Sequence, residues 1–239
     1  MCKNINYSER VKWNVGFFTA KLPLMPFITT HGATAGAVAR QLLQIEAIRI
    51  NHQKPFTWSS GWKSPVYCDN RLALSYPDIR RSIKEALVGC VRHYFPEAAC
   101  IAGVATAGVP QGALVADALH LPYVYVRPKP KDHGMGNLIE GKITRGQRVV
   151  LVEDLVSTGG SSLKAAEALR DAGFSVVGMV AIFTYGFPEA ERAFAAARVP
   201  LVVLSDFDTL LEEAVAMQYV SADDLIYIKS WRLDPAHWS

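Results

Sequence analysis

A strand, an acid pair and a hydroxyl-rich turn follow one another at residues 149–162 and constrain the fold of this chain most strongly. Four apolar residues at 149–152 predict a buried strand, and Glu153 and Asp154 stand at its end. A turn rich in Ser, Thr and Gly follows, and then an apolar helical stripe of Leu163, Ala166 and Leu169. Free N–H groups at a helix start can cradle a phosphate. The segment therefore predicts a strand–turn–helix unit that holds a sugar phosphate.

The acid pair narrows the kind of phosphate site. Glu153 and Asp154 are placed to meet ribose hydroxyls, either directly or through Mg²⁺. A P-loop is excluded because no lysine occupies the required place in the turn after Asp154. The nearest match to a Rossmann fingerprint, at 134–139, lacks the third glycine and lies in a polar loop. An ordinary strand–turn–helix is the alternative, and the adjacent acids and double glycine disfavour it.

Composition bounds the class of protein. The chain has 239 residues, of which half are apolar and a fifth are charged, as in a globular enzyme. A net charge of +3 without a long basic run gives no reason to expect a nucleic-acid partner. Lys21, Pro23 and Pro26 interrupt the apolar stretch near the N-terminus, so no membrane partner is expected. Four cysteines without Cys-x-x-Cys spacing favour free thiols in a reducing cytoplasm.

Regular patterning begins at residue 34. Residues 1–33 are expected to form a loosely ordered N-terminal extension, and 34–239 a single domain. Strands are predicted at 100–105, 123–126, 149–153, 176–183 and 201–204, with helices at 34–47, 77–94, 111–119, 189–197 and 209–217 and after the turn. This alternation predicts an α/β fold with a central parallel sheet flanked by helices. Ligands bind beyond the carboxyl ends of such strands, and residues 34–71 are expected to contribute to a cap over that edge.

A basic loop at 127–141 follows one predicted strand directly. It contains Arg127, Lys129, Lys131 and His133 among glycines, and these cations suit a diphosphate. Such a loop could close over the ligand and exclude water. Beside Lys131, His133 is a candidate diphosphate ligand or proton donor. An ordinary solvated basic loop is the alternative.

The turn at 106–108 leaves two interpretations open. Its small residues suit an ordinary strand-to-helix turn. They would equally let a backbone approach a diphosphate.

Three segments resemble the motifs of a known family in the same order. Residues 56–71, Phe-Thr-Trp-Ser-Ser-Gly-Trp-Lys-Ser-Pro-Val-Tyr-Cys-Asp-Asn-Arg, resemble the amino-terminal motif of the orotate phosphoribosyltransferases, which are type I phosphoribosyltransferases. Residues 131–134, Lys-Asp-His-Gly, resemble their catalytic loop, and 153–161 resemble their motif for phosphoribosyl diphosphate (PRPP). The resemblance runs from about residue 34 to the carboxyl terminus, and the loop motif is the most specific.

The resemblance implies a type I phosphoribosyltransferase-like fold with a small N-terminal hood. It implies transfer of the 5-phosphoribosyl group from PRPP to orotate, giving orotidine 5′-phosphate and diphosphate in de novo pyrimidine synthesis. Mg²⁺ would be held mainly through PRPP and water, near Glu153 and Asp154. Family members are homodimers, so the Arg127–Gly141 loop is expected to act in the partner's site.

The resemblance also assigns roles to residues. The catalytic residues would be Lys131, His133 and Asp154, and Ser157 would contact orotate. The PRPP-binding residues would be Arg127, Lys131, His133, Glu153, Asp154, Leu155, Val156, Ser157, Thr158, Gly159, Gly160 and Ser161.

The chain departs from the common family pattern at several positions. Ser59, Pro128 and Ala107 stand where many members have lysines, and Thr106 precedes Ala107 in place of a tyrosine. Tyr185 stands where many members have an arginine that contacts orotate. Two alternatives stay open, a phosphoribosyltransferase for another nucleobase and a non-catalytic PRPP-sensing regulator.

Overall fold

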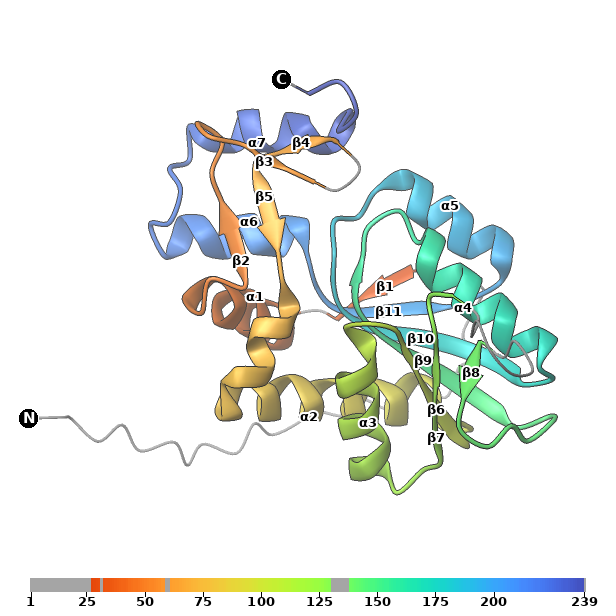
Figure 1. Ribbon diagram of the computed structural model, residues 1–239. Helices are drawn as coiled ribbons and strands as arrows, with labels where there is room; N and C mark the ends of the chain where they lie inside the picture. The colour runs from red at the N-terminus through yellow and green to blue at the C-terminus, as the bar shows by residue number, and fades with distance from the viewer. Residues whose placement is uncertain (1–26, 31, 59–60, 130–137, 239) are drawn as a thin grey trace, which may run out of the picture.

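A seven-stranded sheet forms the centre of the molecule in the computed structural model, which describes residues 27–30, 32–58, 61–129 and 138–238 (Figure 1). Neighbouring strands are parallel except for the last pair, which is antiparallel. The expected parallel sheet is therefore confirmed. In spatial order the strands are β1 (Phe27–Thr29), β11 (Leu201–Asp206), β10 (Ser175–Thr184), β9 (Arg148–Val156), β6 (Cys100–Val104), β7 (Tyr123–Val126) and β8 (Ile139–Glu140).

Helices cover both faces of this sheet (Figure 1). One apolar cluster lies against α1 (Ala33–Gln44), α2 (Pro77–Tyr94), α3 (Gly108–Leu119) and α6 (Phe207–Ala216), and the other against α4 (Gly160–Asp171) and α5 (Pro188–Ala197). Alternate residues of β9 belong to different clusters, Val150 to the first and Leu151 to the second. Both faces are thus buried, which explains why the strand sequences are continuously apolar.

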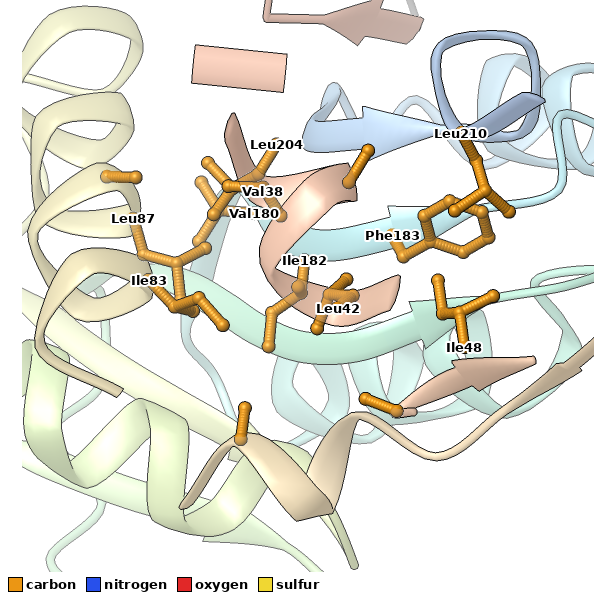
Figure 2. Close-up of a cluster of buried hydrophobic side chains, with 14 of the residues drawn as sticks. Val38, Leu42, Ile48, Ile83, Leu87, Val180, Ile182, Phe183, Leu204 and Leu210 are labelled. Atoms are coloured by element: carbon orange, nitrogen blue, oxygen red, sulfur yellow. The ribbon is translucent and has the colours of Figure 1, made fainter. Parts of the chain in front are cut away.

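The first cluster is the larger core. Figure 2 shows Val38 and Leu42 of α1 and Leu87 of α2 facing Val180 of β10 and Leu204 of β11. Each of these five residues is at most 2% exposed. Their apolar spacing on α1 and α2 follows the helical period, so each helix buries one face on the sheet.

The edge strand β1 corrects the expected boundary at residue 34. Phe27–Thr29 pairs in parallel with β11, and Thr30 Oγ1 donates a hydrogen bond to Leu204 O at 2.7 Å. Phe27 and Ile28 pack against opposite apolar clusters. The expectation that all of 1–33 lies outside the fold is therefore wrong for these residues. Three strand residues are too few to show a period-two pattern; residues 1–26 lie outside the described part.

A second layer of short elements lies beside the sheet. β2 (Ile48–Ile50) pairs with β5 (Val66–Cys68), and β3 (Phe56–Thr57) pairs with β4 (Lys63–Ser64), both antiparallel. The 3₁₀ helix η1 (Asn70–Ser75) leads on to α2, and α7 (Asp224–Leu233) lies over β3 and β4 (Figure 1). We call this layer, which consists of β2, β3, β4, β5, η1 and α7, the cap. The expected cap included residues 34–44, but these form α1, which packs on β11 and the core.

An aromatic cluster joins the cap to the sheet. Trp58 packs on Tyr185 and Trp231, with ring centroids 5.0 Å and 5.4 Å away. Trp231 is fully buried, and its Nε1 donates a hydrogen bond to Lys63 O at 3.0 Å. Phe187 and Phe207 complete the cluster around Trp231. Through Trp231, the carboxyl-terminal helix α7 holds the β3–β4 hairpin in place.

Among the helices described, none has the length and apolar character needed to cross a membrane.

Candidate functional site

The acid pair lies near the carboxyl end of the central strand. Glu153 and Asp154 belong to β9, which continues to Val156 and is therefore longer than expected. Thr184 Oγ1 of β10 donates a hydrogen bond to Val156 O at 2.8 Å, and this bond fixes the end of the strand. The two acids therefore sit on a rigid element in the middle of the sheet.

Glu153 is a buried carboxylate that the protein itself partly satisfies. Its side chain accepts hydrogen bonds from the Asp154 N–H at 3.0 Å and from Ser162 Oγ of α4 at 3.1 Å. Only 5% of the residue is exposed. Burial raises the pKa of Glu153 well above its ordinary value, and the neighbouring charge of Asp154 raises it further. The carboxylate is thus held in one orientation at a cost in desolvation.

Asp154 borders the cavity beside Glu153. Burial raises the pKa of Asp154, while hydrogen bonds oppose that rise. Asn70 Nδ2 donates to Asp154 O at 2.8 Å and so ties the start of η1 to β9. Buried Glu153 and half-buried Asp154, side by side, favour any ligand that brings a cation or hydroxyl donors to them.

A cavity of about 300 Å³ opens next to this pair. It brings together three stretches that are far apart in the sequence, within residues 68–71, 105–107 and 153–161. The Ala105–Thr106 peptide bond in its wall is cis. The lining residues are Cys68, Asp69, Arg71, Ala105, Thr106, Ala107, Glu153, Asp154, Leu155 and Ser161.

The predicted phosphate turn connects β9 to α4. Leu155 and Val156 end the strand, and Gly160 and Ser161 begin the helix; Ser157, Thr158 and Gly159 lie between them. Gly159 has a φ of 84°, and a Cβ there would lie 2.7 Å from Phe194 Cε2, so glycine is required. At Gly160 a Cβ would meet nothing within 4 Å. The first N–H groups of α4 have no partner within the helix and can bind an anion.

The turn at 106–108 shows close packing. A Cβ on Gly108 would collide with Val152 O, so α3 begins directly against β9. Tyr123 OH donates a hydrogen bond to Val109 O at 2.6 Å and anchors the first turn of α3. The packing agrees with an ordinary strand-to-helix turn. It also agrees with a backbone that approaches a diphosphate, because Thr106 and Ala107 line the cavity.

Arg127 lies at the end of β7, but it is not among the residues that line the cavity. Its N–H donates to Leu138 O at 2.8 Å, and its Nη1 lies 3.7 Å from Glu140 Oε1 of β8. Lys131 and His133 fall outside the described residues. Their expected diphosphate role stays a prediction.

Sequence reasoning did not single out Asp69 and Arg71, which the structure brings to the cavity. Arg71 Nε donates to Asp69 Oδ1 at 2.6 Å, and Arg71 Nη2 donates to Asp69 Oδ2 at 2.8 Å. Both residues belong to the quoted 56–71 motif. The available signal was an acidic and a basic residue, two positions apart, just after a strand. This signal did not single them out, because the same pattern is common in ordinary turns.

Tyr185 has a structural explanation. It is 2% exposed and packs between Trp58, Phe187 and Trp231. Burial raises the pKa of its hydroxyl well above the ordinary value. The position where many family members have an orotate-contacting arginine therefore holds a packing residue in this chain.

Comparisons with known proteins agree on one family. The model of the phosphoribosyl transferase domain matches residues 71–207. An orotate phosphoribosyltransferase of Cytophaga hutchinsonii is 58% identical over 201 residues, covering 84% of this chain and 96% of its own. One from Bacteroides fragilis is 56% identical over 200 residues, with 84% and 94% covered.

Solved structures give the same result. The crystal structure of orotate phosphoribosyltransferase from Aeropyrum pernix superposes with a TM-score of 0.67 and 31% identity, covering 77% of this chain and 99% of that one. The expected type I phosphoribosyltransferase fold is confirmed, and the match is to pentosyltransferase enzymes. The chain belongs to the family of orotate phosphoribosyltransferases.

Proposed function

We propose that this protein transfers the 5-phosphoribosyl group from PRPP to orotate, producing orotidine 5′-phosphate and diphosphate in de novo pyrimidine synthesis. The observation that carries the proposal is the acid pair of buried Glu153 and half-buried Asp154 beside the cavity, next to the glycine-rich start of α4. Relatives named orotate phosphoribosyltransferase support the choice of base.

The acid pair would bind and orient the ribose. Asp154 accepts from the ribose hydroxyls, while Ser162 and the Asp154 N–H hold Glu153 in place behind it. Breaking the bond between C1 and the diphosphate develops positive charge on the ribose. Fixed carboxylates nearby stabilise that charge, because they need no reorganisation during the reaction. The chemistry requires no covalent bond to the protein.

Residues 157–161 would hold the 5-phosphate. The N–H groups at the start of α4 and the hydroxyls of Ser157, Thr158 and Ser161 supply the donors. Ser157 would also contact orotate, since it lies where the turn leaves β9. Leu155 and Val156 place the turn by ending the strand.

Mg²⁺ fits the donors that are present. No group of three or more His, Cys, Asp or Glu in the described ranges is arranged to hold an ion alone. Glu153 and Asp154 provide a desolvated acid pair, and PRPP and water would supply the other oxygens that Mg²⁺ prefers. When bound, the ion would neutralise charge on the diphosphate leaving group.

The basic loop would complete the site from a second subunit. We propose a homodimer in which the 127–141 loop of one chain reaches the partner's cavity. Arg127, Lys131 and His133 would then bind the leaving diphosphate, with Lys131 and His133 acting on the departing charge.

The setting proposed for this reaction is the cytoplasm, with no nucleic-acid or membrane partner. Cys68, Cys90 and Cys100 are free thiols, which suits a reducing compartment. Burial raises the pKa of Cys90 to about 12, so this thiol stays protonated and unreactive.

The test is a base panel with the purified full chain. With PRPP and Mg²⁺, the absorbance of orotate should fall and diphosphate should appear in equal amount. Adenine, hypoxanthine and uracil are assayed in parallel. Preference for a purine would establish the alternative of another nucleobase. PRPP binding by calorimetry without turnover of any base would establish the regulator.

A further inference from the structure

The lining of the cavity carries more acidic than basic side chains. Three carboxylates line it, those of Asp69, Glu153 and Asp154. Arg71 is the sole cation among the lining residues that the structure describes. Orotate carries a carboxylate that must enter this acidic surrounding. Placing a further anion there requires a nearby cation, because like charges repel strongly where water is displaced.

Within the described residues, the guanidinium of Arg71 is held from one side only. Its Nε and Nη2 donate to the two oxygens of Asp69, at 2.6 Å and 2.8 Å, which is the side-on edge of the fork. The Arg71 N–H also donates to Asp69 Oδ1, at 3.2 Å. The side chain is therefore oriented before any ligand arrives, which reduces the entropy lost on binding.

The other edge of the fork has donors to spare. A guanidinium has five N–H groups, and the pairing with Asp69 uses two of them. The end-on edge, formed by Nη1 and Nη2, has no hydrogen bond to another residue in the described ranges, and 61% of the side chain is exposed. This edge matches a planar carboxylate, which it can bind through two parallel hydrogen bonds.

Arg71 is also close enough to the acid pair to influence it. Burial raises the pKa of Asp154, and the charge of Arg71 opposes that rise. Asn70, the residue before it, donates to Asp154 O and fixes the spacing between this part of the cap and β9. A base bound by Arg71 would thus lie next to the proposed ribose site.

We propose that Arg71 binds the carboxylate of orotate through its end-on edge, that Asp69 holds the guanidinium in position, and that this pair makes the enzyme prefer a carboxylated base. The inference rests on the proposed function. The competing anion is the phosphate chemistry of PRPP. Because Arg71 and Ser161 line the same cavity, the affinities for PRPP and diphosphate are measured beside the KM for orotate to distinguish the two anions.

The experiment compares Arg71→Gln and Arg71→Lys with Arg81→Gln. Arg81 is a matched control, because its side chain is 62% exposed and it pairs with Asp78 at 3.5 Å. For Arg71→Gln we expect the KM for orotate to rise about 10- to 100-fold, the loss typical of hydrogen bonds to a charged group. Arg71→Lys should give a smaller rise, since it keeps the charge and loses the fork.

The same variants are assayed with PRPP and with uracil, which lacks the carboxylate. The KM for PRPP, the affinity for diphosphate and the slow rate with uracil should stay within about twofold of the wild type. The preference for orotate over uracil should therefore fall in Arg71→Gln by the factor lost with orotate. Asp69→Asn should lower the preference for orotate over uracil less than Arg71→Gln does, because the arginine remains but is less well oriented.

Three results would overturn the inference. One is a weaker affinity for PRPP or diphosphate with an unchanged KM for orotate, which would assign Arg71 to phosphate. Another is an unchanged orotate-to-uracil ratio in the Arg71 variants. The last is an equal effect of Arg81→Gln. An inactive wild-type protein would instead refute the proposed function, and melting temperatures identify any variant that fails to fold, in which case Arg71→Lys and Asp69→Asn decide.

Discussion

Glu153 shows how a single residue combines a structural cost with a functional position. It is buried and hydrogen-bonded, yet its raised pKa shows that the site disfavours its charge. The native protein holds the Glu153 proton more tightly than the unfolded chain does. Its contribution to stability is therefore full below the ordinary pKa of 4.5 and is lost as pH rises through the raised native value.

Glu153→Gln should consequently be more stable than the wild type in the absence of ligands. The amide can accept from the Asp154 N–H and donate to Ser162 Oγ, so both contacts survive. The melting temperature should rise by about 2–4 °C for each kcal/mol relieved. The gain should grow as pH rises above the ordinary pKa of 4.5. Scanning calorimetry at a series of pH values above 4.5 checks this, and a gain independent of pH would contradict it.

The sequence allowed the acid pair and the phosphate turn to be predicted because the motif is local. Glu153 and Asp154 follow a continuous apolar strand, and the turn follows at once. Asp69 and Arg71 could not be found in this way. Their relevance depends on Asn70 reaching Asp154 across 84 residues of sequence, and no local pattern contains such a contact.

At the scale of elements, length decided what could be predicted. The long strands and helices were identified within a few residues, because each has several apolar positions at a regular spacing. The two- and three-residue strands β1, β2 and β8 were missed, since they are too short to show a period. Helix α7 was missed for another reason. It buries Ile228 and Trp231 but exposes Ile226 and Leu233, so its apolar residues do not form one stripe.

The edge strand gives a prediction at this scale. A chain beginning at Met25 keeps β1, and a chain beginning at residue 33 lacks it. Loss of two half-buried side chains, Phe27 and Ile28, and of their strand pairing should cost about 2–3 kcal/mol. The melting temperature of the shorter chain should be lower by about 4–12 °C. Equal melting of the two chains would show that β1 contributes nothing to stability.

At the scale of the whole molecule, the fold concentrates separate segments at one edge of the sheet. The cap segment before α2, the turn after β6 and the end of β9 meet around one cavity. This convergence was predictable from the parallel topology. How the cap is built was not, because Trp231 of α7 must contact Trp58 and Tyr185 from distant parts of the chain.

The proposed shared site predicts recovery of activity in mixed dimers. Lys131→Ala and Asp154→Asn should each be nearly inactive. After random subunit exchange, half of the dimers are mixed, and each has one site with an intact loop and an intact Asp154. About a quarter of wild-type activity should therefore return. If exchange is confirmed by mass spectrometry and no activity returns, the loop acts within its own subunit or the protein is not such a dimer.

The central claim is that the acid pair at the end of β9 is the centre of phosphoribosyl transfer. Its most direct test is the rate of orotate consumption by Asp154→Asn at limiting PRPP, with Asp78→Asn as control because Asp78 is exposed on α2. We predict a loss of at least about 100-fold in kcat/KM for Asp154→Asn without a fall in melting temperature, and wild-type rates for the control. Near-normal turnover by Asp154→Asn would contradict the account.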